Sequence, residues 1–354
     1  MKGFVLYERG KTEIRDVEKP VCGKKDIIIK VESAAICGGD VHFYNGSLDL
    51  GGYPIVMGHE FAGVIDEMGP EADDSYFKVG DRVVSENTYS VCGRCPACER
   101  GDFVQCPERR TMGCDQDGAF AQYVRVPGEL LEVYKNCLFK LPESIDMKYA
   151  PLLEPASNAY KAVIQEGELM PGENVVVFGA GALGLYSAQI AAVAGAANVI
   201  VVGMEADKEL RFPCAKKLGA THTLVNGPDV DLAGEIAKIC GPSGVALVID
   251  AAGPPIVLKQ AIDIVRFDGT IVRIGMNDRP LDMGMNIVNV KSIDIKGHMG
   301  YNTTSWRCVM NLAAAGKLDL SSMVTHTLPL TEINKGFDLL KEMTAIKILI
   351  DPSK

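Results

Sequence analysis

The sequence predicts an α/β protein of two domains, a β-rich domain followed by a doubly wound parallel sheet. Its 354 residues exceed the length of about 250–300 at which one hydrophobic core usually stops growing. Short β-prone runs broken by glycine and charged residues occupy roughly the first 150 positions. From about Glu166, apolar strands alternate with helical segments, a pattern typical of a parallel sheet covered by helices.

The first domain is expected to span residues 1–155 and to form a barrel-like β structure. Its clearest strand candidates are Ile27–Val31, Gly63–Glu67 and Arg82–Ser85. The end of the chain carries only a helical stretch, Leu330–Met343, and a last strand, Ile346–Ile350. Because these elements are too few to fold alone, we expect residues 296–354 to pack back onto the first domain.

The second domain is expected to span residues 156–295, where strand and helix patterns alternate. Its expected elements, in chain order, are Asn174–Phe178, Leu183–Ala194, Asn198–Val202, Leu210–Leu218, Ala246–Asp250 and Thr270–Ile274.

Composition and charge exclude several classes of protein. Hydrophobic residues make up 47% of the chain and charged residues 23%, without an apolar run of eighteen residues, which argues against membrane spans and disorder. The net charge of −10 argues against nucleic acid as a partner. Since the start, MKGFVLYERG, does not resemble a signal peptide, the expected location is cytoplasmic, and the expected partner is a small molecule.

Four cysteines lie close together in the segment VCGRCPACERGDFVQC: Cys92, Cys95, Cys98 and Cys106. Four thiolates on a glycine-containing loop can enclose one tetrahedral zinc ion and leave no position for a substrate. The segment therefore predicts a structural zinc site. An iron–sulfur cluster, which also takes four cysteine ligands, and a redox-active pair are the alternatives.

A glycine pattern at the start of the second domain indicates dinucleotide binding. An apolar strand comes directly before Gly179, Gly181 and Gly184, and an apolar helix directly after them. The first glycine allows a tight turn, the second a close approach to a pyrophosphate, and the third close packing of helix on strand. The wider set of residues expected to contact the cofactor also includes Ala182, Leu183, Glu205, Arg211, Ala252 and Gly275.

The choice between NAD and NADP depends on the end of the second strand of this domain. Gly203 stands where NAD enzymes place an acidic residue, but no basic residue follows directly to bind a 2′-phosphate. Glu205 would repel such a phosphate, so NAD is favoured. Lys208 and Arg211 are the residues that would reverse this preference.

A second metal site is predicted by two short motifs, CysGlyGlyAspValHis at 37–42 and GlyHisGlu at 58–60. A thiolate from Cys37 and an imidazole from His59 leave zinc with open positions, as a catalytic metal needs. Either Glu60 or Glu154 would supply a third ligand. Each residue alone would more often be structural, so the prediction depends on the combination.

These motifs, together with GHEFAGVI, VGDRV, DGAFAQYV, LLEPAS, GAGALG, AKKLGA and IKILI, run nearly from end to end of the chain. The sequence resembles the zinc-containing medium-chain dehydrogenase/reductase superfamily, nearest its sorbitol and polyol dehydrogenase branch. This resemblance implies a GroES-like first domain, a Rossmann second domain, one catalytic and one structural zinc ion, and a homodimer or homotetramer.

The resemblance also implies roles for individual residues. Cys37, His59 and Glu60 match the catalytic zinc ligands of the polyol branch. Glu154 matches a carboxylate that binds zinc or holds its water, and Asp40 matches the acid that orients the zinc-binding histidine.

Two departures from the family pattern affect the expected chemistry. Gly39 replaces a serine or threonine whose hydroxyl passes the substrate proton outward, so His42, Tyr44, Glu154 or water must replace it. Gly300 replaces an arginine that touches the substrate in sorbitol dehydrogenases, whereas the neighbouring Tyr301 is retained. Tyr44, Glu154 and Tyr301 are therefore the expected substrate residues, and His298 or Arg307 are candidates for the lost cation.

The predicted function is reversible oxidation of a secondary hydroxyl in a polyol, sugar, cyclitol or sugar-alcohol phosphate, with hydride transfer to a nicotinamide. Oxidation of an amino alcohol such as threonine, or of a hydroxy acid, is the nearest alternative. A zinc-stabilised nucleotide-binding sensor that has lost its chemistry is the alternative from another class, and Gly39 is the residue that favours it.

Overall fold

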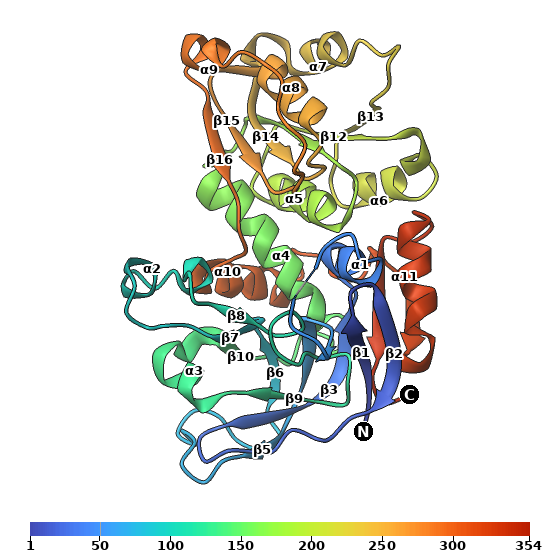
Figure 1. The fold of residues 1–354 in the computed structure, drawn as a ribbon. Helices are drawn as coiled ribbons and strands as arrows, with labels where there is room; N and C mark the ends of the chain where they lie inside the picture. Colours follow the sequence, from blue (N-terminus) through green and yellow to red (C-terminus); the bar gives the residue numbers. More distant parts are fainter. Residues whose placement is uncertain (50) are drawn as a thin grey trace. The chain divides into compact units, whose positions relative to one another are not determined.

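The computed structural model describes residues 1–49 and 51–354, and the chain divides into two compact units. Unit 1 consists of residues 1–154, 302–315 and 324–354, and unit 2 of residues 155–301 and 316–323. Residues 296–301 and 316–323 were expected to pack onto the first domain, but they group with unit 2. The first of these segments continues from strand β16 (Asp294–Gly297) of the unit 2 sheet, and in the second the Ser322 carbonyl accepts from the Cys214 thiol at 3.6 Å. Figure 1 labels the elements of both units.

Unit 1 is built on mainly antiparallel β-sheets, with one parallel pair at the edge of the largest sheet. Strand β3 (Ile27–Ala35) lies at the centre of the largest one, in which it pairs with β5 (Glu60–Met68), β9 (Tyr123–Val126) and β18 (Lys347–Asp351). The same sheet continues through β6 (Arg82–Ser85) and β10 (Leu138–Lys140) on one side and β17 (Val324–Pro329) on the other. The smaller sheets are β2 (Lys11–Asp16), β1 (Lys2–Glu8) and β4 (Ile55–Val56), and the pair β7 (Thr88–Ser90) and β8 (Arg110–Thr111).

The C-terminal strand β18 completes the sheet of unit 1. Its sequence, KILID, is buried along four of five positions, and Leu349 pairs with Ala35 of β3. The helix before it, α11 (Ile333–Lys341), packs Phe337 against Phe4 and Tyr44 in the core. Other helical segments of this unit are α1 (Gly38–Tyr44), α2 (Pro96–Glu99), η1 (Phe103–Gln105), α3 (Gly128–Val133), η2 (Lys135–Cys137), η3 (Ala150–Leu152), α10 (Thr303–Ala314) and η7 (Leu330–Glu332).

Unit 2 contains a parallel sheet of six strands in the order β13-β12-β11-β14-β15-β16. Their bounds are His222–Val225, Asn198–Gly203, Asn174–Phe178, Val245–Asp250, Val265–Arg273 and Asp294–Gly297, respectively. Strands β11 and β14 are buried at every position because helices cover both faces of the sheet. Numbered along the chain, this order is 3-2-1-4-5-6, the order of the Rossmann fold. The predicted α/β fold is confirmed.

Helices α5 (Ala182–Val193) and α6 (Arg211–Lys217) lie on one face of this sheet, and α7 (Leu232–Cys240) and α8 (Pro255–Ile264) on the other (Figure 1). Unit 2 also contains the helical segments η4 (Lys161–Glu166, π-helical), η5 (Glu205–Asp207), η6 (Gly241–Ser243) and α9 (Asn286–Lys291). Helix α4 (Leu153–Tyr160) contains Glu154 in its first turn. In the described part of the chain, every helix is too short or too polar to cross a bilayer.

Candidate metal centres and cofactor site

The first metal-binding motif forms the start of helix α1. Cys37 is the N-cap residue, and its Sγ accepts a hydrogen bond from the Gly39 N–H at 3.4 Å. Asp40, fully buried in the first turn, accepts from the Cys37 N–H at 3.1 Å. This reciprocal capping fixes the thiol and the carboxylate at one helix end.

The second motif is brought to this helix end by strand pairing. Glu60 begins β5 and pairs with Ala35, two residues before Cys37, at the end of β3. Gly58 precedes the histidine with a φ of 95°, and a Cβ there would lie 2.6 Å from the Phe120 ring, so the turn requires glycine.

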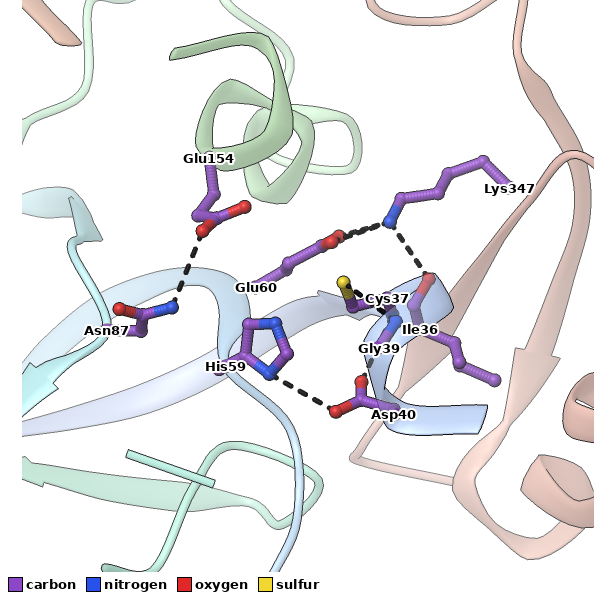
Figure 2. Close-up of polar contacts among 9 residues, drawn as sticks. All are labelled: Ile36, Cys37, Gly39, Asp40, His59, Glu60, Asn87, Glu154 and Lys347. Atoms are coloured by element: carbon purple, nitrogen blue, oxygen red, sulfur yellow. Dashed lines mark hydrogen bonds and ion pairs between the residues drawn. The ribbon is translucent and has the colours of Figure 1, made fainter. Parts of the chain in front are cut away.

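As a result, donor atoms of Cys37, His59 and Glu60 all lie within 4.8 Å of one another (Figure 2). Their thiol, imidazole and carboxylate are the donors that zinc accepts at about 2.0–2.3 Å, so the donor set fits this ion.

The electrostatics of the histidine depend on Asp40. His59 Nδ1 lies 3.2 Å from Asp40 Oδ1, which leaves Nε2 for a metal. Burial lowers the pKa of His59, but the charges of Asp40 and Cys37 raise this pKa by more than burial lowers it. The pKa of His59 is therefore well above its usual value. Burial also raises the pKa of the Cys37 thiol. A divalent cation would oppose both effects, because it stabilises the thiolate and the neutral imidazole.

Glu60 has a cationic neighbour that sequence reasoning missed. Lys347 of β18 is 2% exposed, and its Nζ lies 2.5 Å from Oε2 and 2.7 Å from Oε1 of Glu60. The same ammonium donates to the Ile36 carbonyl at 2.9 Å (Figure 2). A lysine inside the apolar run IKILI was the signal in the sequence that could have identified it.

The other carboxylate, Glu154, lies outside the three-residue group. It is 6% exposed in the first turn of α4, and its Oε1 accepts from the Asn87 Nδ2 at 3.4 Å (Figure 2). Asn87 was not predicted either, although a polar Glu86-Asn87 pair directly after the apolar strand β6 marked the position.

The four-cysteine loop brings its sulfur atoms together as well. Donor atoms of Cys92, Cys95, Cys98 and Cys106 lie within 4.8 Å of one another, and Cys92 Sγ lies 3.6 Å from Cys106 Sγ and 4.0 Å from Cys98 Sγ. Zinc bonds of about 2.3 Å in a tetrahedron place sulfurs roughly 3.8 Å apart. In a four-iron cluster each cysteine sulfur binds a different iron, so the cysteine sulfurs lie further from one another than they do around a single zinc ion. The spacing therefore fits a single ion.

The backbone supports the charged form of one of these thiols. The backbone N–H of Arg94 is the largest influence on Cys92 and lowers the pKa of its thiol to about 7. A thiol with such a pKa is readily deprotonated, as metal binding requires.

In unit 2, the three glycines of the fingerprint have three different surroundings. Gly179 has a φ of 98° directly after β11, and Gly181 caps α5 with open space where a Cβ would stand. A Cβ on Gly184 would lie 1.8 Å from the Gly179 carbonyl, which forces close packing of α5 on the strand. Ala182 and Leu183 form the first turn of α5. The open helix start fits a pyrophosphate.

Ala252 and Gly275 lie at the carboxyl ends of the neighbouring strands β14 and β15. The Ala252 N–H donates to Asp250 Oδ1 at 3.1 Å, and the Gly275 N–H donates to the Asp250 carbonyl at 2.8 Å. A Cβ on Gly275 would lie 2.4 Å from the Gly253 nitrogen. Both residues thus meet at the edge where Rossmann folds bind dinucleotides.

Comparison with known proteins agrees with this architecture. Two family models match, "Alcohol dehydrogenase GroES-like domain" over residues 23–135 and "Zinc-binding dehydrogenase" over residues 182–315. The zinc-type alcohol dehydrogenase-like protein YdjL of Escherichia coli (strain K12), itself named as uncharacterized, is 42% identical over 99% of this chain and 98% of its own. The chain belongs to the zinc-containing medium-chain dehydrogenase/reductase superfamily.

Relatives of this superfamily member differ in their named substrates. A sorbitol dehydrogenase of Halalkalibacterium halodurans and an L-threonine 3-dehydrogenase of Bacillus velezensis are each 32% identical over 99% of both chains. Among solved structures, the alcohol dehydrogenase TADH from Thermus sp. ATN1 superposes with a TM-score of 0.88 at 28% identity, covering 99% of both chains.

The residues that bear on cofactor choice form a small cluster after β12. Asp207 is 3% exposed and accepts from the Met204 N–H at 2.7 Å and from Arg211 Nη1 at 3.1 Å. A Cβ on Gly203 would lie 2.6 Å from the Asp207 carboxylate. Glu205 is exposed and pairs with Lys208 at 2.7 Å. In this dehydrogenase both candidate phosphate-binding cations therefore already have carboxylate partners.

Of the residues of unit 1 that were predicted to relay the proton or contact the substrate, His42 is exposed and Tyr44 packs in the core. His42 is exposed on α1, with Nδ1 3.0 Å from Ser47 Oγ. Tyr44 stacks on Phe337 with ring centroids 4.3 Å apart, so its ring is part of the core packing. A Cβ on Gly39 would have only Cys37 Sγ as a neighbour, at 3.7 Å, so packing does not exclude a side chain there.

The remaining candidates lie at the end of unit 2 and on α10. Tyr301 is 1% exposed and follows Gly300, whose φ is 62°. His298 Nδ1 lies 2.6 Å from Glu166 Oε2, so the ring is held by an acid of its own unit. Arg307 is exposed and donates to Asn136 Oδ1 at 2.8 Å.

Proposed function

We propose that this superfamily member is a zinc-dependent dehydrogenase that oxidises a secondary alcohol of a polyol, sugar, cyclitol or sugar-alcohol phosphate with NAD. The observation that carries the proposal is the donor group of Cys37, His59 and Glu60 within 4.8 Å, beside a carboxylate at position 154. Classical alcohol dehydrogenases have a cysteine at the position of Glu154, whereas the polyol branch has a carboxylate there.

In the proposed mechanism, Cys37 and His59 hold the catalytic zinc, and Glu60 or Glu154 completes its protein ligands. Zinc in this position supplies a Lewis acid that lowers the pKa of a substrate hydroxyl. Asp40 keeps the His59 ring in place by its contact with Nδ1. Lys347 balances the charge of Glu60 in a fully buried setting.

The substrate proton leaves this site without a hydroxyl at position 39. His42 lies on the same helix as Cys37 and is exposed, so it is the proposed group that exchanges a proton with solvent. Ser47, 3.0 Å from His42, supplies a hydroxyl to the same ring. Tyr44 is a weaker candidate because its ring stacks on Phe337.

NAD is proposed over NADP because of the cluster after β12. Arg211 is paired with the buried Asp207, and the exposed Glu205 carries the charge that repels a 2′-phosphate. Binding of NADP would require Lys208 or Arg211 to leave a carboxylate partner.

A homodimer or homotetramer is the proposed assembly, with subunits pairing through the edge of the unit 2 sheet. Strand β16 ends that sheet, and the adjacent helix α9 exposes Val290, 66% accessible, and Ile287. An unpaired edge beside exposed apolar side chains is a common pairing surface. The cytoplasmic location stays a prediction.

The alternatives are separated by one experiment. The purified protein is offered a panel of polyols, sugars, sugar-alcohol phosphates, threonine and hydroxy acids with NAD or NADP, and absorbance of the reduced nicotinamide is followed. Zinc content is measured on the same preparation. Turnover of polyol-type substrates with NAD supports the proposal, turnover of threonine alone contradicts it, and cofactor binding without any turnover supports the sensor.

A further inference from the structure

We propose that Asn87 and Arg109 are positioning residues that orient the Glu154 carboxylate at the catalytic metal site. The inference rests on the proposed function, since it assigns these residues to the same site. Neither residue belongs to the two metal-binding groups, and both lie in unit 1.

Three side chains form the connection. The Arg109 Nη2 donates to Asn87 Oδ1 at 2.5 Å, and the Asn87 Nδ2 donates to Glu154 Oε1 at 3.4 Å. Asn87 is 8% exposed and Glu154 6% exposed. Because both are nearly excluded from water, a change in one side chain is transmitted to the other rather than compensated by solvent.

The guanidinium determines which end of the Asn87 amide faces the carboxylate. An arginine can only donate hydrogen bonds, so it takes the amide oxygen and leaves the NH₂ group on the opposite side. An ionised carboxylate can only accept, so it requires that NH₂ group. With Arg109 in place, the amide therefore presents a donor to Glu154. Without it, the amide oxygen loses this donor, and an amide turned the other way would present its oxygen to the carboxylate, which would repel it.

Arg109 is itself fixed from two directions. Its Nε donates to Thr88 Oγ1 at 3.0 Å, and Thr88 is fully buried. Its backbone N–H donates to the carbonyl of Cys106, the last cysteine of the four-cysteine loop, at 3.0 Å. The end of the four-cysteine loop thus holds Arg109, which is connected to Glu154 through the Asn87 amide. This connection gives the loop a role in the catalytic site in addition to its own stability.

The charges around Arg109 agree with this role. Burial is the main cause that raises the pKa of the fully buried Glu86, the hydrogen bond from Tyr134 and the charge of Arg109 lower it, and the charge of Glu154 raises it. The half-buried Arg109 therefore acts electrostatically on the pocket that holds both carboxyl groups. Substitution of residues that orient metal ligands typically costs about 10–100-fold in metal affinity or activity.

The test uses the holoenzyme with Arg109→Met, Arg109→Lys and the matched control Arg110→Met. Arg110 is the exposed next residue, so its variant should behave like the wild type. We expect Arg109→Met to lower kcat about 10–100-fold with a smaller change in KM, and to raise the apparent Kd of the catalytic zinc in competition with a chelator. Arg109→Lys, which keeps a donor for Asn87 Oδ1, should recover much of the loss.

A double substitution tests whether the effect passes through Glu154. In a Glu154→Ala background, Arg109→Met should change the zinc Kd little, whereas independent effects would multiply and overturn the proposal. Equal behaviour of Arg109→Met and Arg110→Met would also overturn it. The zinc Kd is measured without a substrate, so it tests the role of Arg109 even if no substrate in the panel is turned over. Failure of this proposal can therefore be told apart from failure of the proposed function.

Discussion

Lys347 Nζ lies between the two carboxylate oxygens of Glu60, 2.5 Å from Oε2 and 2.7 Å from Oε1. The lysine is 2% exposed and the glutamate 0% exposed, so water screens neither charge. A metal ion that takes Glu60 as a ligand must therefore share this carboxylate with the lysine. The charge balance of the site includes a residue of the last strand of the chain.

In the zinc-free protein, Lys347→Met is expected to lower the free energy of unfolding by about 3–5 kcal/mol, because it leaves the Glu60 carboxylate buried without its lysine partner. The double variant Lys347→Met with Glu60→Met should recover part of this loss. Denaturant unfolding measures both. The control is Lys354→Met, which breaks an exposed pair with Asp351 and should cost less than about 1 kcal/mol. A Lys347→Met variant as stable as the control would contradict the assignment.

Cys37→Ala and His59→Ala are expected to abolish turnover and lower the zinc content by about one ion per chain, because each removes a donor from the open metal site. The fold should persist, since neither side chain is a large member of the core. Metal analysis and circular dichroism check both statements. The matched control is Cys22→Ala, a free cysteine outside both metal groups. Retained activity in Cys37→Ala would refute the catalytic site.

Cys98→Ser is expected to remove the second zinc ion and lower the thermal midpoint, because Cys98 is buried within the four-thiol group. Metal analysis of the wild type should find zinc without stoichiometric iron or sulfide. Iron and sulfide in equal amounts would instead establish a cluster in this loop and overturn the zinc assignment.

Gly39→Ser is expected to fold and to raise kcat severalfold, because a Cβ there has only an ordinary contact of 3.7 Å and the new hydroxyl joins the proton path. His42→Ala should lower kcat in the wild type. Steady-state rates against pH, with and without deuterated water, check both changes. If Gly39→Ser leaves the rate and the solvent isotope effect unchanged while zinc stays bound, the proton does not leave along α1.

Glu86→Gln is expected to stabilise the protein at pH 8. Burial raises the pKa of Glu86 to about 8 from 4.5, more than Tyr134 and Arg109 lower it. Between these values the folded state holds a proton that the unfolded state has lost, so stability falls as pH rises, by up to about 1.4 kcal/mol per unit. Glutamine, which does not titrate, removes this loss.

Unfolding midpoints of the wild type and Glu86→Gln should therefore converge near pH 4–5 and separate toward pH 8. Glu99→Gln, a substitution on the exposed surface of α2, is the control and should give parallel curves. A wild type that is more stable than Glu86→Gln at pH 8 would show that the carboxylate is ionised and paired in the fold.

Much of the fold was predictable because its patterns are local. The buried strand Asn174–Phe178 and the glycines after it predict a strand, a turn and a helix from neighbouring residues alone, and the structure has them at those positions. The prediction of the last helix was less accurate. The predicted stretch Leu330–Met343 is divided into η7 and the shorter α11, and α11 ends before Met343, whose φ is 61°. Helix ends depend on such backbone details more than on hydrophobic period.

From the sequence alone we predicted the two groups of donor residues that the structure brings together, the fingerprint glycines and the missing hydroxyl at position 39. The balance of the buried charges became visible only in the folded chain. Lys347 meets Glu60 across 287 positions because β18 pairs with β3, and β5 pairs with the other edge of β3. The Arg109 guanidinium likewise reaches Asn87 Oδ1 through a contact between two separate segments of the chain. Such pairs arise from long-range strand and loop contacts, which no local pattern in the sequence encodes.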